Sequence, residues 1–262
     1  MRASESICVL ILFLFILLGL IRPLDLQRRF RVIGLGIAGI LLVGLGTSHP
    51  MIRDWVPSLI LLFVYWQGGS FFSQPHEKLQ AYLLRMDQLL LAKWPDLNNS
   101  RQDAQGGRSN VYWEIAYFFC YPLVPGAIAV LYALNLRGSV DFFWTVVLPP
   151  TFLCHLIVSF YQTYPPWKFL DPKSPPGTIR RLNFLVIRHA SIQLNTFPSA
   201  HVAASMAAAF AMLYLHPLVG IAFVFLAISI TAATVIGRYH YAADALLGFL
   251  LALGWYGIAV LL

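Results

Sequence analysis

Long apolar stretches recur along the chain and are separated by shorter polar connections. A helix needs about 20 mostly apolar residues to cross the hydrocarbon layer of a membrane. Eight stretches approach this pattern and predict about eight spans: 6–21, 32–48, 55–73, 111–134, 141–162, 197–215, 217–236 and 242–262. The stretch 55–73 is the weakest, because Pro57, Gly68 and Gly69 leave it open to a kink or a re-entrant path. The pattern therefore predicts an all-α, polytopic transmembrane bundle.

The connection after the third stretch has the spacing of an amphipathic helix near 76–92. Its apolar residues recur three and four positions apart: Leu79, Tyr82, Leu83, Met86, Leu89 and Leu90. Lys78, Arg85 and Asp87 lie off this stripe. We therefore expect a helix that lies in the membrane interface.

The connection 163–196 is rich in proline and in positive charge. Its prolines exclude one continuous helix over the whole segment. Its cations are Lys168, Lys173, Arg180, Arg181 and Arg188. This basic connection leads directly into the first stretch of residues with candidate chemistry.

The composition excludes a soluble enzyme, a disordered chain and a fibrous chain. Hydrophobic residues make up 59% of the chain and charged residues 11%, whereas a soluble domain carries roughly 25% charge. The net charge is +7, which in this setting favours membrane lipids or an anionic substrate over nucleic acid. The three cysteines lie far apart in apolar stretches and indicate packing residues.

The segment Phe197–His201 opens an alanine-rich stretch directly after the basic connection. Ser199 is a candidate N-cap, and His201 then falls in the first helical turn. Free backbone N–H groups and the helix dipole make such a turn a site for phosphate. A histidine in this place also fits a simple interfacial role.

The segment Gly237–Asp244 opens the last stretch. His240 and Asp244 are four residues apart and share a helix face. The carboxylate can accept the proton of one ring nitrogen, which leaves the other nitrogen as a base or a nucleophile. A structural ion pair or a headgroup anchor is the alternative.

Two apolar stretches separate His201 from His240, with a turn at His216-Pro217. A helical hairpin of this kind returns the chain to the same membrane face. We therefore expect His201, His240, Asp244 and Arg238 to converge below the basic connection. Such a set suits phosphoryl transfer through a phosphohistidine. A metal site is the rival, and the lack of a His-x-x-x-His pair or a Cys/His cluster disfavours it.

Other residues near these stretches have less specific interpretations. The aromatic residues around Glu114 indicate an interfacial belt: Tyr112, Trp113, Tyr117 and Tyr121. Tyr121-Pro122 and Pro125-Gly126 predict a break inside the stretch 111–134, which could line a path for lipid. His155 is interpreted as a packing residue.

The two histidine segments resemble motifs of the type 2 phosphatidic acid phosphatase (PAP2) superfamily. The family's Pro-Ser-Gly-His motif is similar to Pro198–His201, with Ala200 in place of glycine, and its His-x-x-x-Asp matches His240 to Asp244. The family places an arginine six residues before that histidine. Here Thr234 stands in that place, and the arginine is Arg238.

The remaining features match the family less closely. The family's Lys-x6-Arg-Pro motif resembles Lys173 and Arg180, but Arg181 follows instead of proline. Pro165-Pro166-Trp167 and the His-Tyr-x-x-Asp form are similar to the branch that contains inositol phosphorylceramide synthases. The resemblance covers residues 55–262 as a six-helix catalytic core. It leaves 1–54 as two extra N-terminal helices.

The resemblance implies a role for each matching residue. His240 is the nucleophile, Asp244 orients it, and His201 protonates the leaving group. Candidates for holding the phosphate are Arg238, Lys173, Arg180, Arg181 and Ser199. No metal or other cofactor is implied. The substrate would be a lipid phosphate, such as phosphatidate, phosphatidylglycerol phosphate or an isoprenyl diphosphate.

Two alternatives to hydrolysis remain open. A lipid phosphotransferase would use the same residues and move a phosphorylated headgroup to a lipid hydroxyl. A non-enzymatic lipid-binding or transport protein would use the intramembrane charges differently. The oligomeric state is not indicated by the sequence.

The expected location is the cell membrane, with the face of the active site open. On the eight-span pattern, Arg2, Arg53 and Arg137 lie on one face and the other 15 of the 18 Lys and Arg residues on the catalytic face. The positive-inside rule places that face in the cytoplasm. Bacterial members of the resembled family usually direct it to the periplasm.

Overall fold

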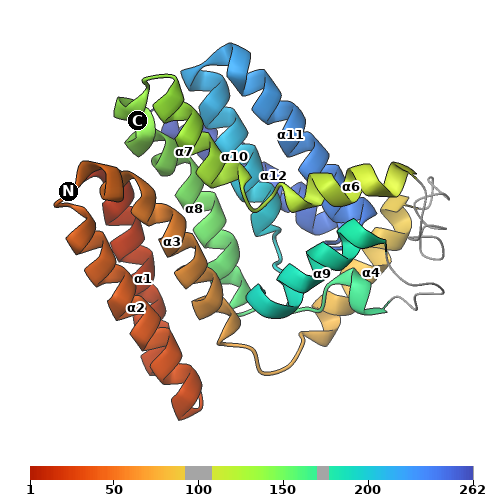
Figure 1. Cartoon of the computed structure of the whole chain (residues 1–262). Helices are drawn as coiled ribbons and strands as arrows, with labels where there is room; N and C mark the ends of the chain where they lie inside the picture. The colour runs from red at the N-terminus through yellow and green to blue at the C-terminus, as the bar shows by residue number, and fades with distance from the viewer. Residues whose placement is uncertain (92–107, 170–176, 262) are drawn as a thin grey trace.

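The computed structural model describes residues 1–91, 108–169 and 177–261 (Figure 1). Within these ranges the chain forms α-helices and two short 3-10 helices, with no named strand. The predicted all-α architecture is confirmed. The helices are α1 (Ala3–Ile21), α2 (Leu26–Gly46), α3 (Pro50–Gly69), α4 (Glu77–Leu91), α6 (Arg108–Phe118), α7 (Leu123–Ala133), η1 (Arg137–Ser139), α8 (Val140–Val158), η2 (Pro166–Phe169), α9 (Thr178–Ala190), α10 (Ala200–Leu215), α11 (Pro217–Ile236) and α12 (Ala242–Ala259).

Every predicted span overlaps a helix of the structure. Some of these helices are too short or too polar to cross a membrane by length and composition. Within the described residues, five are long and apolar enough, namely α1, α2, α8 with its preceding η1, α11 and α12. The pair α6 and α7 counts as a sixth span if it is taken as one, with a bend of 67° at the predicted break. The helix α10 has 16 residues. The helix α3 runs unbroken through Pro57 but carries Arg53 and Asp54, which lower its hydropathy.

The helix α10 lies at the centre of the bundle and packs against α8, α11 and α12 (Figure 1). Its sequence is rich in alanine, and Ala203, Ala207 and Ala211 are fully buried. Small side chains allow neighbouring helices to approach closely in a membrane bundle. Gly248 of α12 shows how close, because a Cβ there would lie 2.5 Å from the carbonyl oxygen of Ser199. This contact holds the start of α10 against α12.

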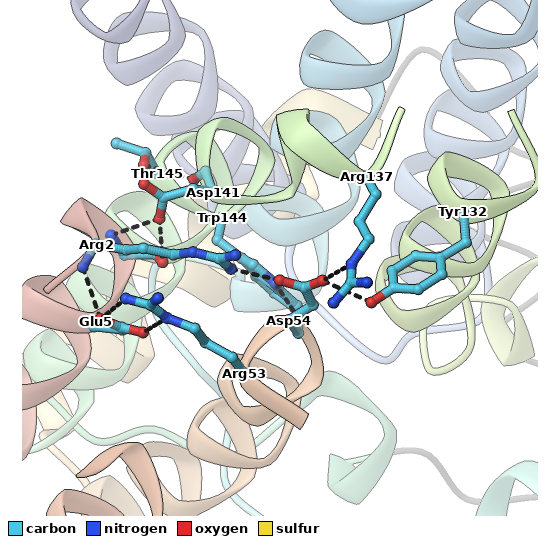
Figure 2. A network of polar contacts seen from close by, with 10 residues as sticks. Arg2, Glu5, Arg53, Asp54, Tyr132, Arg137, Asp141, Trp144 and Thr145 are labelled. Carbon is cyan, nitrogen blue, oxygen red and sulfur yellow. Dashed lines mark hydrogen bonds and ion pairs between the residues drawn. The ribbon is translucent and has the colours of Figure 1, made fainter. Parts of the chain in front are cut away.

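The helices α1 and α2 form a hairpin that packs along α3, and α1 also packs along α8 (Figure 1). A polar network joins α1 to α3, α7, η1 and α8 (Figure 2). At its centre, Asp54 is fully buried and accepts hydrogen bonds from Arg2, from the Tyr132 hydroxyl at 2.6 Å and from Arg137 Nε at 2.9 Å. The extra N-terminal hairpin is therefore bound to the rest of the bundle through buried charges.

A second part of the network lies beside the first on α1. Glu5 pairs with Arg53, and Ser4 Oγ donates to Asp141 Oδ1 at 2.5 Å (Figure 2). The division of the chain at residue 55 remains a prediction. The helix α3, which contains this position, begins at Pro50.

Two short helices lie beside the ends of the long ones. The helix α4 lies where the amphipathic helix was predicted, near 76–92. Asp87 is only 4% exposed and faces the bundle, while Tyr82, Leu89 and Leu90 are exposed. The helix α9 was not predicted, because the prolines of the basic connection masked it; they all precede its first residue, Thr178.

Candidate active site

His201 occupies the first turn of α10, as the sequence predicts. The Ser199 hydroxyl caps this helix by accepting from the backbone N–H of Val202 at 3.4 Å. The Ser199 backbone N–H donates to the carbonyl oxygen of Asp244 at 3.0 Å. The same two contacts therefore place His201 at the start of α10 and anchor that start to α12.

His240 lies in the short loop 237–241 between α11 and α12, which we call the His240 loop. The backbone N–H groups of Tyr239 and His240 both donate to the carbonyl oxygen of Thr234 at 2.9 Å, which folds the loop back on α11. Arg238 adopts a left-handed backbone conformation with φ of 62°. That conformation is uncommon for a residue with a side chain, so surrounding contacts must hold it.

The structure brings His201, His240 and Asp244 together. The rings of His201 and His240 meet edge to face, with 5.6 Å between their centroids. The Nδ1 atom of His240 lies 3.5 Å from Oδ2 of Asp244, and that oxygen accepts from the backbone N–H of Tyr241 at 3.0 Å. The carboxylate thus faces Nδ1 of His240, and Nε2 is the nitrogen left for chemistry.

Burial keeps His240 neutral. The side chain is 6% exposed, and removal from water lowers its pKa to about 3 because the charged form is disfavoured. A neutral imidazole has a nitrogen lone pair available for attack or for proton transfer. The local electrostatics therefore suit His240 to act as a nucleophile or a base at neutral pH.

Two of the arginines predicted to hold phosphate, the buried Arg238 and the partly buried Arg180, have carboxylate partners. Arg238 Nη1 lies 2.5 Å from Asp87 Oδ2. Arg180 Nη1 lies 2.6 Å from Glu114 Oε1, and Arg180 Nη2 donates to the carbonyl oxygen of Gly237 at 3.2 Å. Arg238 thus belongs to the His240 loop and Arg180 contacts it. The contact of both with phosphate remains a prediction.

The other predicted phosphate ligands have different surroundings. Arg181 is exposed on α9. The Ser199 hydroxyl is fully buried and caps α10. Lys173 lies outside the residues that the structure describes.

Glu114 of α6 contacts both α9 and the His240 loop. The sequence did not predict this role. Besides Arg180, it accepts from the Tyr239 hydroxyl at 2.6 Å and from Asn183 Nδ2 at 2.8 Å. The Tyr239 ring in turn stacks on Tyr117 with 3.5 Å between centroids. The signal available was a carboxylate near the start of an apolar stretch. Placing an ionisable side chain in a membrane costs free energy unless it is paired.

Two of the four aromatic residues expected in a belt at 112–121, Tyr117 and Tyr121, contact His201. Tyr117 is 3% exposed, and its ring centroid lies 5.9 Å from that of His201. Tyr121 meets the same histidine at 5.8 Å, and it lies at the break between α6 and α7. Both rings were assigned to the membrane surface because a sequence pattern does not show which aromatic residues turn inward.

Other residues from the basic connection also support the His240 loop. The backbone N–H of Trp167 donates to the carbonyl oxygen of Arg238 at 3.0 Å. Asn195 is fully buried next to Asp244, and its Nδ2 donates to Thr163 Oγ1 at 3.1 Å. Lys168 lies over the Tyr164 ring at 4.2 Å, and partial burial lowers the pKa of its ammonium group. These residues place the proline-rich segment against the candidate site.

A cavity of about 560 Å³ opens beside the two histidines. Its walls come from α3, from the break between α6 and α7, and from α8, α9 and the start of α10. The residues that line it are mainly apolar or aromatic, and they include His201, His240 and His155. A pocket of this size and character suits a small apolar ligand or one part of a lipid. Among the described residues, no group of three His, Cys, Asp or Glu is arranged to hold a metal ion.

The apolar helices form a bundle of the membrane-protein type, in which His201 and His240 lie together beside a cavity. The sequence model of the PAP2 superfamily matches residues 81–258, which is more than half of the chain, and the chain belongs to this superfamily. Membership suggests lipid phosphatase or phosphotransferase activity. Searches of curated proteins and of solved structures gave no match.

Proposed function

We propose that this protein hydrolyses a lipid phosphate through a covalent phosphohistidine at His240. The observation that carries the proposal is the convergence of His240, Asp244 and His201 at one end of an apolar cavity. The substrate candidates are phosphatidate, phosphatidylglycerol phosphate and an isoprenyl diphosphate. The lipid tail would occupy the cavity, and the phosphate would face the two histidines.

In the first step, Nε2 of His240 attacks phosphorus and the bond from phosphorus to the leaving oxygen breaks. The carboxylate of Asp244 stabilises the positive charge that develops on the ring. His201, in its protonated form, donates a proton to the leaving oxygen and becomes neutral. The products of this step are phospho-His240 and the leaving lipid, which is diacylglycerol from phosphatidate, phosphatidylglycerol from its phosphate, or an isoprenyl monophosphate from an isoprenyl diphosphate.

In the second step, His201 takes a proton from water and the resulting nucleophile attacks the phosphohistidine. The nitrogen–phosphorus bond breaks, and inorganic phosphate leaves. The backbone N–H groups at the start of α10 and the nearby guanidinium groups of Arg180 and Arg238 would stabilise the charge on phosphorus oxygens in both steps. Lys173 and Arg181 are further candidates for this role.

A phosphotransferase is the alternative within the same chemistry. A lipid hydroxyl would replace water in the second step, and the phosphorylated headgroup would pass to that lipid. The Pro165-Pro166-Trp167 string and the His-Tyr-x-x-Asp form, which resemble inositol phosphorylceramide synthases, favour this alternative. A lipid-binding or transport protein without turnover is the second alternative.

The decisive assay is phosphate release from phosphatidate in detergent micelles that contain EDTA. Wild type should release phosphate, and His240→Ala should not, although it folds. His189→Ala is the matched control, because this histidine is exposed on α9, and it should keep full activity. Release by His240→Ala at the wild-type rate would contradict the proposal. Transfer to an added lipid hydroxyl without phosphate release would favour the phosphotransferase.

We also propose the cell membrane as the location, with the face of the site to be decided by labelling. Gly138 and Lys78 are exposed near opposite ends of the bundle. The native cysteines are buried, so Gly138→Cys and Lys78→Cys each add one accessible thiol. An impermeant maleimide added to intact cells should label one variant and not the other, and labelling at Lys78→Cys would place the site outside.

A further inference from the structure

His155 is a third histidine in the cavity, and the proposed mechanism does not use it. It lies near the end of α8, is 5% exposed, and lines the same cavity as His201 and His240. It is close enough to His201 for charges on the two rings to interact. The Tyr65 ring meets it edge to face at 5.5 Å between centroids. The sequence had indicated only a packing role for this residue.

The His155 side chain has a hydrogen-bonding requirement that the protein leaves unmet. Its Nδ1 atom is buried and has no hydrogen-bond partner among the residues that the structure describes. A neutral imidazole has one donor and one acceptor nitrogen, and buried polar groups nearly always have partners. Nδ1 itself is closed off from the cavity, but the ring lines the cavity, so a polar atom of a bound molecule would meet the ring at Nε2.

Two polar side chains near His155, Thr151 and Tyr65, already have hydrogen-bond partners. The Thr151 hydroxyl, one turn before His155, donates to the carbonyl oxygen of Val147 at 2.7 Å. The Tyr65 hydroxyl accepts from the backbone N–H of Ile192 at 2.8 Å. His155 is therefore one group prepared to meet a ligand atom. Ser58 of α3 also lines the cavity, and its buried Oγ has no hydrogen-bond partner among the described residues.

The position of His155 defines which part of a substrate it would meet. A substrate whose phosphorus lies at His240 would extend its first carbon atoms into the cavity that His155, His201 and His240 all line. In a glycerolipid or a sphingolipid these atoms carry ester, amide or hydroxyl oxygens. In an isoprenyl phosphate they belong to a hydrocarbon chain that offers no hydrogen bond.

We infer that His155 binds an ester or hydroxyl oxygen next to the scissile phosphate, and that the substrate class is a glycerolipid or similarly oxygenated lipid phosphate. This inference rests on the proposed function, since it takes the phosphate to lie at His240. Sites built to hydrogen-bond a substrate discriminate strongly against an analogue that lacks the bonding group. The residue thus selects against isoprenyl phosphates.

Two probes and two variants test the inference. The probes are dioleoyl phosphatidate and geranylgeranyl monophosphate in the same mixed micelles. His155→Phe keeps a ring but removes hydrogen bonding, while His155→Gln keeps a donor and an acceptor. The matched control is His189→Phe on the exposed face of α9. Melting curves in detergent verify that each variant is folded.

Wild type should prefer phosphatidate. His155→Phe should lower kcat/KM for phosphatidate by about tenfold or more, mainly through KM, and leave geranylgeranyl monophosphate unchanged. His155→Gln should recover much of the loss, and His189→Phe should match wild type. Equal losses on both probes, no loss on phosphatidate, or a wild-type preference for geranylgeranyl monophosphate would overturn the inference.

A binding measurement separates this inference from the proposed hydrolysis. Trp66 and Trp167 line the cavity, so their fluorescence reports its occupancy. In the His240→Ala background, phosphatidate should change this fluorescence at lower concentration than geranylgeranyl monophosphate does, and adding His155→Phe should remove the difference. If wild type hydrolyses neither probe, the proposed function fails and this binding result alone decides the role of His155. Equal binding of both probes would refute that role.

Discussion

Asp87 and Arg238 form a buried ion pair that joins two parts of the chain 151 residues apart, with 2.5 Å between Oδ2 and Nη1. The other carboxylate oxygen of Asp87 accepts from the backbone N–H of Ala242 at 3.0 Å. Asp87 thus binds Arg238 and Ala242, which precede and follow His240 by two residues. Gln80 of the same helix adds a third contact, because its Nε2 donates to the Tyr241 hydroxyl at 2.5 Å. The helix α4 therefore positions the His240 loop.

Asp87→Asn should lower both activity and stability. The substitution keeps an acceptor for Ala242 but removes the charge opposite Arg238, whose backbone has a left-handed conformation. Loss of one member of a buried pair costs about 3 kcal/mol of unfolding free energy, and displacement of His240 should lower kcat roughly tenfold. Detergent melting curves and steady-state kinetics measure the two effects.

The control for Asp87 is Glu77→Gln, an exposed carboxylate at the start of the same helix. It should behave as wild type. The double variant Asp87→Asn/Arg238→Met should lose less than the sum of the two single variants, since the pair acts as a unit. Additive losses would show that Asp87 does not act through Arg238.

Gly248→Ala should separate the two helices that carry the histidines and the aspartate. An added Cβ would lie 2.5 Å from the carbonyl oxygen of Ser199, so the start of α10 must move away from α12. Overpacking of this kind costs about 1–3 kcal/mol, and a small displacement of His201 should lower kcat at least tenfold. Gly254→Ala on the same helix is the control, since nothing lies within 4 Å of its added Cβ. Full activity in Gly248→Ala would contradict the role of this contact.

Asp54→Asn should destabilise the protein without changing substrate recognition. Asp54 pairs with Arg2 and Arg137, and these buried contacts bind α1 and η1 to α3 (Figure 2). Its loss should cost about 3 kcal/mol, whereas Asp25→Asn at an exposed pair should cost about 1 kcal/mol or less. The apparent melting temperature should fall for Asp54→Asn, and KM should remain that of wild type. A raised KM with unchanged melting temperature would show that the network serves the site instead.

The pH dependence of stability should report the buried, neutral His240. Its folded pKa of about 3 lies below the ordinary value of 6.5, so the unfolded chain binds a proton that the folded protein does not. Stability from this group is present above pH 6.5 and falls as the pH decreases towards the folded pKa, by up to about 2 kcal/mol between pH 7 and pH 5. His240→Asn should show a smaller drop in melting temperature over this range. An equal drop in both proteins would contradict the assignment.

Features that depend on neighbours in the sequence were predicted well. Ser199 caps α10, Tyr121-Pro122 lies at the break in the stretch 111–134, and the turn at His216-Pro217 joins the two helices of the hairpin that returns the chain to His240. Each of these rests on local backbone preferences or on the parity of apolar stretches. Both can be read from a single sequence.

Features that depend on distant partners were not predicted. Asp87 was placed off the apolar stripe of its helix, but the sequence did not indicate that it pairs with Arg238. Tyr117 was assigned to the membrane interface and Glu114 was given no role, although both contact Tyr239. Helical periodicity shows which residues share a face but not which residue of another helix that face meets.

The most direct test of the central claim is to trap the covalent intermediate. Wild type is mixed with phosphatidate that carries a radioactive phosphorus, quenched in alkali, and separated from lipid. The account predicts a label on the protein that is stable in base and lost in acid, as a phosphohistidine is, and that maps to His240. No label should appear on His240→Ala, while the exposed-site control His189→Ala should be labelled like wild type. Label retained by His240→Ala, or phosphate release by wild type without any labelled protein, would contradict the account.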